Sequence, residues 1–383
     1  LGSQPSKNYP YQSVFNIESG YFLFDGTRYP TGITTPSLTN PSLTWEKSTT
    51  KNLGFDFIFL QNRLSFTADI FERKVTDILI PGGKEYPALI GDDNLPLENA
   101  GVLKTTGFEL QAKWSDKLAN GLRYSVGVAL SDDKAKVVSY PSNPTNSIGD
   151  GKLYKGFTVG DIWGYETGGI LQEGDFDGVG ANGKPLYHGP YFKGGQAYPG
   201  YVWYQDLNHD GVITGGLGTV DNPGDRKVIG NNAPRYRYNI TANVQYKGFD
   251  LDVMFQGVGK RDYWLSSSSS YWGGGAGSWE TYNDSWTPER TNAKFPMYGY
   301  GLGSYTQSGY LLDASYIKLK QVILGYTFPK NMINKIGLEK LRLNIAAYNL
   351  FTISDVPKYY DSDYISDAYP PKRTFSVGIQ VGF

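Results

Sequence analysis

The amino-acid sequence predicts an all-β protein, and more narrowly a transmembrane antiparallel β-barrel with long extracellular loops. Three observations support this fold class. First, apolar and polar residues alternate with period two in many segments. Second, these segments are long. Third, the connections between them are alternately short and long. Glycine and aromatic residues, which favour turns and strands, are abundant, at 48 Gly and 15% aromatic in 383 residues.

Each alternating segment places apolar residues on one face and polar residues on the other. In the segment 238–246, Tyr238 and Tyr246 flank Ile240 and Val244, which is typical of an aromatic girdle around a lipid-facing band. Several segments reach about nine residues, the length that a tilted strand needs to cross a bilayer. The predicted strands include residues 53–59, 64–70, 108–114, 122–130, 238–246, 249–255, 341–345 and 373–383.

The connections between these strands are short on one side and long on the other. The predicted turns at 60–63, 115–121, 246–249 and 329–340 are short, whereas 139–234 and 259–314 are long. Outer-membrane barrels have short periplasmic turns and long extracellular loops. A soluble β-sandwich shows the same alternation, because its apolar faces pack inward. Strand length and loop asymmetry favour the barrel, and the sandwich remains the alternative.

Composition argues against several other classes of protein. The 36 basic and 37 acidic residues leave a net charge of −1, whereas a nucleic-acid-binding protein usually has a basic face. The sequence has no cysteine, so disulfides and thiolate metal sites are excluded. It has two histidines and no nucleophile elbow, zinc-protease or phosphate-loop motif, so we predict no enzyme. No run of 18 apolar residues predicts a transmembrane helix.

The chain ends on an alternating strand, "RTFSVGIQVGF", whose last residue is aromatic. This ending resembles the signal by which the outer-membrane assembly machinery recognises barrel proteins. In a sandwich, the same terminal residue would simply fill a core. We predict that the polar residues of this strand face the lumen. The lipid-facing residues are predicted to be Phe375, Val377, Ile379, Val381 and Phe383.

The segment "DLNHDGVIT" (206–214) has the spacing of the first half of an EF-hand calcium loop. Oxygen-bearing side chains stand at its first, third and fifth positions, and Gly211 at the sixth allows the sharp turn. The twelfth position is Leu217 instead of Glu, so a later aspartate would have to close the site. The alternative is a surface turn without metal. The candidate calcium ligands are Asp206, Asn208, Asp210, Val212 through its carbonyl, Asp221 and Asp225.

The long loops are rich in aromatic residues next to Gly and Ser. Exposed aromatic rings in loops stack on sugar rings or contact a protein partner. The alternative is that these rings pack the loops against one another. The candidate residues facing substrate or partner are Trp163, Tyr165, Trp203, Tyr204, Trp264, Trp272 and Trp279.

Several motifs together resemble the SusC/RagA-type TonB-dependent transporters of the Gram-negative outer membrane. They follow the family's order along most of the chain. In "NAGVLKTTGFEL", Thr105 and Thr106 replace the family's usual polar pair, which is a minor departure. The motifs are "NPSLTWEKSTTKNLGFDF" (40–57), "NAGVLKTTGFEL" (99–110), "DRKVIGNNAPRYRYNI" (225–240), "DSWTPERTNAKFP" (284–296), "SYIKLKQVILGYTFP" (315–329) and "LRLNIAAYNLFTIS" (341–354).

The resemblance implies that residues 1–383 are the C-terminal portion of a 22-stranded barrel, with about half of its strands. Plug, TonB box and first strands would lie outside this sequence. It further implies an outer-membrane importer of glycans or peptides, energised by TonB and capped by a SusD-like lipoprotein. A dimer of transporter–lipoprotein pairs is a further expectation. The alternative function is a secreted, calcium-stabilised β-sandwich that binds carbohydrate. Substrate identity stays open.

Overall fold

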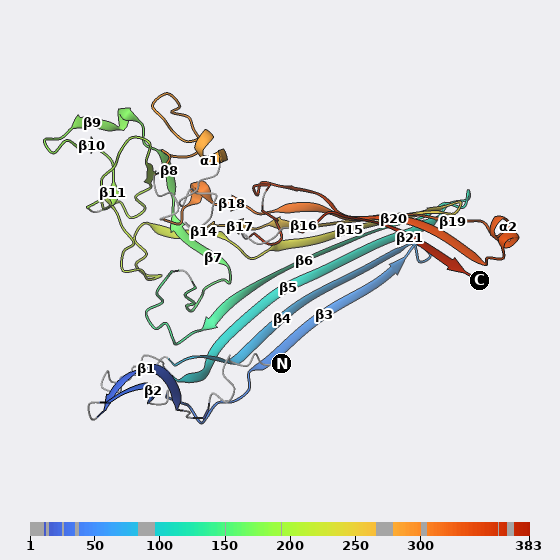
Figure 1. Cartoon of the computed structure of the whole chain (residues 1–383), viewed down its shortest axis with the longest axis horizontal. Coiled ribbons are helices and arrows are strands. Elements are labelled where there is room, and N and C mark those ends of the chain that lie inside the picture. The colour runs from blue at the N-terminus through green and yellow to red at the C-terminus, as the bar shows by residue number, and fades with distance from the viewer. Residues whose placement is uncertain are drawn as a thin grey trace.

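The computed structural model describes residues 11–12, 15–24, 27–34, 38–82, 96–149, 151–192, 194–265, 279–299, 305–358, 360–365 and 371–383. Among these residues, one antiparallel sheet of nine strands dominates the molecule (Figure 1). Its order is β21-β20-β19-β16-β15-β6-β5-β4-β3. The strands are β3 (Lys47–Phe59), β4 (Leu64–Pro81), β5 (Leu97–Lys117), β6 (Arg123–Ser139), β15 (Arg235–Tyr246), β16 (Phe249–Lys260), β19 (Tyr316–Thr327), β20 (Lys340–Ser354) and β21 (Thr374–Gly382).

Tight turns join neighbouring strands at one end of the sheet. The two residues between β15 and β16, Lys247 and Gly248, both have positive φ, at 48° and 88°. Two positive φ values match the right-handed twist of a hairpin, and glycine adopts them without a steric cost. Residues 60–62 also have positive φ between β3 and β4. Between β19 and β20 the chain forms α2 (Lys330–Ile333) and η6 (Asn334–Ile336).

The long connections all lie at the opposite end of the sheet (Figure 1). They contain short elements that pair mostly with one another. In the connection from β6 to β15, β7 (Asp161–Tyr165) pairs with β14 (Arg226–Asn231), and β8 (Thr167–Ile170) pairs with β12 (Val202–Tyr204). The predicted asymmetry of turns and loops is thereby confirmed. Two short strands precede β3 in the chain, β1 (Asn16–Phe24) and β2 (Thr27–Thr34). The other short elements of the connections are η2 (Glu173–Asp175), β9 (Phe176–Val179), β10 (Pro185–Tyr187), β11 (Tyr191–Phe192), β13 (Val212–Ile213), β17 (Asp262–Tyr263), α1 (Trp279–Asn283), η5 (Ser308–Tyr310) and β18 (Leu312–Asp313).

The register of the sheet separates its residues into an apolar and a polar face. One continuous cross-strand row passes through all nine strands and is apolar at every position. Because successive side chains point to opposite faces of a sheet, this row defines the apolar face. In sheet order from β3 to β21 the row is Phe59, Leu64, Trp114, Val126, Ala242, Val253, Val322, Ala347 and Phe375.

The apolar face is exposed instead of buried. Val126, Leu324 and Ile345 are exposed on inner strands, and Val377 on β21 is 76% exposed. Phe375, Ile379, Val381 and Phe383 are exposed as well. An exposed apolar patch of this extent marks a surface that contacts a partner or a membrane.

The buried hydrophobic cluster lies elsewhere, among the loops at the long-connection end. Its members include Val202, Ile213, Leu265 and Ala314. A β-sandwich would bury the apolar face of one sheet against a second sheet. Among the described residues, the other sheets are two-stranded, and none extends across the nine-stranded sheet. No helix among these residues is both long enough and apolar enough to cross a membrane.

Candidate functional site

The polar face of the sheet carries hydrogen-bonding and charged side chains along its length. A row on this face runs through Asp56, Thr67, Gln111, Ala129, Asn239, Gln256, Lys318 and Thr352. Thr67 donates to Asp56 at 2.6 Å, and Asn243 donates to Asp252 at 2.6 Å. The face therefore offers many donors and acceptors, as the wall of a water-filled path requires.

A cavity of about 710 Å³ opens on this polar face near the loops. Asp69 and Glu109 lie opposite each other on β4 and β5 and line one side. Asn239, Gln256 and Arg237 line the other side, and Arg237 forms an ion pair with Asp133. The cavity thus combines acidic, basic and amide groups and suits a polar solute.

A buried lysine ties the connection after β20 to this face of the sheet. Lys318 on β19 has a side chain that is 3% exposed, and it donates to Asp361 at 3.0 Å and Asp363 at 2.7 Å. Arg261 donates to the backbone oxygens of Ser362 and Asp363. Leaving the buried Lys318 charge without its aspartates would be costly, so this network holds the connection after β20 in place. This network could not be predicted from the sequence, where its only signal is a lysine at an inward position of the predicted strand 315–329.

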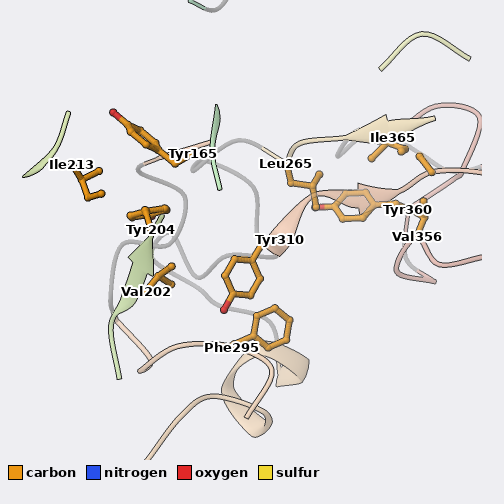
Figure 2. Close-up of a cluster of buried hydrophobic side chains, with 11 residues drawn as sticks. Tyr165, Val202, Tyr204, Ile213, Leu265, Phe295, Tyr310, Val356, Tyr360 and Ile365 are labelled. Atoms are coloured by element: carbon orange, nitrogen blue, oxygen red, sulfur yellow. The ribbon is translucent and has the colours of Figure 1, made fainter. Parts of the chain in front are cut away.

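Aromatic rings form much of the buried cluster among the loops (Figure 2). Tyr204 is 1% exposed, and its ring centroid lies 5.3 Å from that of Tyr165. Phe192 stacks on Tyr305 beside them, with centroids 4.5 Å apart. Burial raises the pKa of Tyr204, so its hydroxyl stays neutral. Two of the predicted loop aromatics, Tyr165 and Tyr204, therefore pack the loops together from within.

A second cavity of about 710 Å³ lies among the loops and has aromatic walls. It brings together three of the predicted residues, Trp163, Tyr165 and Trp264, with Tyr305. The Trp163 ring nitrogen donates to the hydroxyl of Tyr154 at 2.9 Å, which fixes the orientation of the indole. Polar side chains share the lining, namely Lys152, Asp161, Arg226 and Asn232. Flat rings beside such groups can stack on a sugar ring or hold a peptide side chain.

Two further predicted aromatics, Trp203 and Trp279, are not part of the lining of this cavity. The Trp203 ring packs on Gly168, where a Cβ atom would come within 2.3 Å of the ring. Trp279 on α1 is 74% exposed and lies next to Tyr282, with ring centroids 5.6 Å apart. Trp272 lies outside the described residues. The structure thus divides the six predicted residues that it describes among a core, a cavity and the surface.

The predicted calcium loop folds as a compact turn. Asp206 accepts backbone hydrogen bonds from His209 at 2.7 Å and Gly211 at 2.8 Å, and Asp210 accepts one from Val212 at 2.9 Å. Desolvation alone would raise the pKa of Asp206, but backbone hydrogen bonds from Gly211, His209 and Asp210 lower it overall. Among the described residues, no three His, Asp or Glu side chains gather in a group that could hold a metal ion.

Asp225 differs from the other candidate ligands because it is fully buried, at 0% exposure. Its two carboxylate oxygens accept hydrogen bonds from the backbone amides of Leu207 at 2.9 Å and Thr214 at 2.7 Å. These amides belong to the two ends of the 206–214 loop. Asp225 therefore closes this loop by hydrogen bonding, whereas Asp221 is exposed.

Comparison with known protein families gives one match. Residues 8–350 match the family model described as TonB dependent receptor-like, beta-barrel. The chain is 27% identical to the TonB-dependent receptor P3 of Formosa agariphila, over 98% of this chain and 38% of the relative. It is 25% identical to the TonB-dependent receptor SusC of Bacteroides thetaiotaomicron, over 97% of this chain and 35% of the relative. The chain thus spans little more than a third of these relatives.

Solved structures show the same fold. The chain superposes on the RagAB peptide importer in its open-open state with a TM-score of 0.71 at 19% identity, covering 98% of this chain and 38% of that one. The closed-closed state gives a TM-score of 0.70 at 18% identity, covering 100% of this chain and 40% of that one. At this identity, the likeness concerns the fold alone.

Proposed function

This chain belongs to the TonB-dependent receptor-like β-barrel family, and from that premise we propose that it forms part of an outer-membrane nutrient importer. The family consists of transporters and not of enzymes, which agrees with the prediction from sequence. The resemblance of this chain to SusC/RagA-type transporters, predicted from the motifs, is confirmed by the matches to SusC and to RagAB.

One observation carries the proposal: the nine-stranded sheet exposes its apolar face and places polar groups and a cavity on the other. In water, an exposed apolar face of nine strands would aggregate, whereas lipid covers it at no cost. The polar face then lines the path of the solute. The soluble sandwich was the alternative, and neither the exposed apolar face nor the family match agrees with it.

The edges of the sheet support its being a section of a larger barrel. Among the described residues, β3 pairs only with β4, and β21 pairs only with β20. All 13 residues of β3 are exposed, as are most residues of β21. Unpaired backbone groups in a bilayer are too costly to persist. We therefore propose that further strands join β3 and β21 and close the barrel, with residues 1–383 as its C-terminal part.

The substrate and the partners are part of the same proposal. A SusD-like lipoprotein would cover the loop end, and TonB would supply energy through a plug. RagAB is named a peptide importer, and this chain is 25% identical to the TonB-dependent receptor SusC. The aromatic cavity around Trp163 and Trp264 suits a glycan or a peptide, so both classes remain open. A dimer of transporter–lipoprotein pairs stays a prediction.

Membrane fractionation tests the proposed function directly. We expect the full-length protein to remain in the outer-membrane pellet through washes with high salt and with alkaline carbonate, because its apolar face is covered by lipid. Only detergent should release it. Release by carbonate alone, detected by immunoblotting against a peripheral marker protein, would contradict the proposal.

Calcium in the 206–214 loop also remains a proposal, supported by the alternation of Asp206, Asn208 and Asp210. We expect the purified protein to bind calcium by isothermal titration, and the double variant Asp206→Ala/Asp210→Ala to lose this binding. Glu173→Ala/Asp177→Ala, which removes two exposed acids from a neighbouring loop, is the control. Equal calcium binding by the parent and the Asp206→Ala/Asp210→Ala variant would refute the site.

A further inference from the structure

Six lysines form a cluster on the outward face of β3–β6, the face that also carries the apolar residues. The register between these strands is regular from Lys47 to Phe59 on β3 and from Leu103 to Lys117 on β5. Side chains two residues apart therefore share a face. On β4, for example, Lys74 follows the exposed Ile70 on the same side. The lysine cluster consists of Lys47, Lys51, Lys74, Lys104, Lys134 and Lys136.

Three members of the cluster lie in one row across adjacent strands. Lys74 lies directly opposite Lys104, and Lys104 lies directly opposite Lys136. Directly opposed side chains have Cβ atoms about 5 Å apart, and like charges at that separation destabilise a sheet. A row of three lysines is therefore unfavourable unless an anion lies among them.

The acidic residues of the protein neutralise only part of this charge. Lys104 pairs with Glu72 at 2.7 Å, and Lys47 pairs with Asp77 at 2.9 Å. Glu72 also lies directly opposite Lys51 and attracts Lys51 and Lys74 electrostatically, so one carboxylate serves three lysines. Asp132 on the same face is already paired with Arg235. Within the described part of the chain, no carboxylate oxygen lies within 4.0 Å of the ammonium groups of the other four lysines, Lys51, Lys74, Lys134 and Lys136.

The position of the cluster identifies its surroundings, and this step rests on the proposed function. The lysines lie on the loop-end parts of β3–β6, beyond the apolar band, where an outer-membrane barrel meets the outer leaflet headgroups. The cluster is local, because on β20 the outward positions near the loops are Phe351 and Ile353, both apolar and exposed. It is therefore a patch on one side of the protein.

We propose that the lysine cluster binds the phosphate groups of an anionic lipid in the outer leaflet. Lysine binds phosphate as a mobile point charge, and its long stem can lie along apolar surface while the ammonium group reaches outward. The acyl chains of the same lipid would lie on Leu53, Phe55 and Ile70, which are exposed next to the cluster. The lysines would thus contact the phosphates, and the neighbouring apolar residues of the same strands would contact the acyl chains.

The test compares lipid binding by the intact purified protein and by Lys74→Gln/Lys104→Gln/Lys136→Gln. The probe is bisphosphorylated lipid A in mixed micelles, with zwitterionic phosphatidylcholine as the reference. We expect the triple variant to bind lipid A about 100-fold more weakly, because each of the three lysines near a lipid surface contributes about a factor of five. Lys155→Gln/Lys184→Gln/Lys335→Gln removes three exposed lysines elsewhere and should bind as the parent does.

Other results would overturn the proposal. Unchanged affinity in the triple variant would show that the row is not the binding site. Equal thermal stabilisation of the parent by inorganic phosphate and by lipid A would identify the ligand as a free anion instead of a lipid. If the triple variant does not fold, Lys74→Gln and a salt titration of the parent replace it, and salt-independent binding would refute the cluster. A protein that stays in the membrane through carbonate but fails these tests contradicts only this inference.

Discussion

Val244→Arg is expected to destabilise the folded barrel by about 2–4 kcal/mol, the cost of a cation near the middle of the lipid-facing band. Val244 lies on the apolar face, directly opposite Tyr124 on β6 and Leu251 on β16. An arginine there must either enter lipid or bend toward a distant headgroup. Urea unfolding of the full-length protein in lipid vesicles measures the free energy, and resistance to unfolding in cold SDS gives a second readout.

Thr241→Arg is the matched control, because Thr241 lies on the same strand but on the polar face. It is exposed and lies opposite Gly127, which leaves room for a longer side chain. We expect a change within about 0.5 kcal/mol, as for most exposed substitutions. Equal losses in the two variants would show that the assignment of the two faces is wrong, since only one of them can contact lipid.

Asp225→Ala is expected to destabilise the loop region by about 3 kcal/mol. The substitution leaves the amides of Leu207 and Thr214 without acceptors, and each buried unpaired donor costs about 1–3 kcal/mol. Strand insertion should be unaffected, because Asp225 precedes β14 in the loops. Limited proteolysis should therefore cut near residues 206–225 in the variant, while the nine-stranded sheet stays intact in the same sample.

Asp221→Ala provides the comparison for Asp225, since Asp221 is exposed and lies four residues earlier in the sequence. We expect its proteolysis pattern to match that of the parent. Asp225→Asn, which keeps one acceptor oxygen, should give an intermediate loss. If Asp225→Ala is cleaved no faster than Asp221→Ala, the hydrogen bonds to the loop ends contribute little to its stability.

The sequence alone predicted the all-β fold, the two faces of the strands and the family. Alternation with period two is a local property, because the side chains of a strand point to opposite faces whatever it pairs with. Every second residue from Phe375 to Phe383 could therefore be assigned to the apolar face without knowing its neighbours. The family motifs lie within short continuous segments and could be recognised in the same way.

The roles of the loop aromatics could not be predicted in this way. Tyr204 and Trp279 are both aromatic residues of the long loops, yet Tyr204 is buried and Trp279 is exposed. Burial depends on contacts between segments far apart in the chain, such as Tyr204 with Tyr305. The hydrogen bonds of Asp225 to Leu207 and Thr214 could not be predicted for the same reason, because they join residues that no local pattern connects.

What the sequence by itself determined, then, is the direction in which each strand residue points and the end of the sheet at which each connection lies. Only the tertiary structure decided which residues meet across strands and loops. Lys74, Lys104 and Lys136 are unremarkable along the chain and become a single charged row through the register of β4, β5 and β6. The physical reason is that side-chain alternation follows from the backbone of one strand, whereas register and loop packing follow from hydrogen bonds and contacts between distant residues.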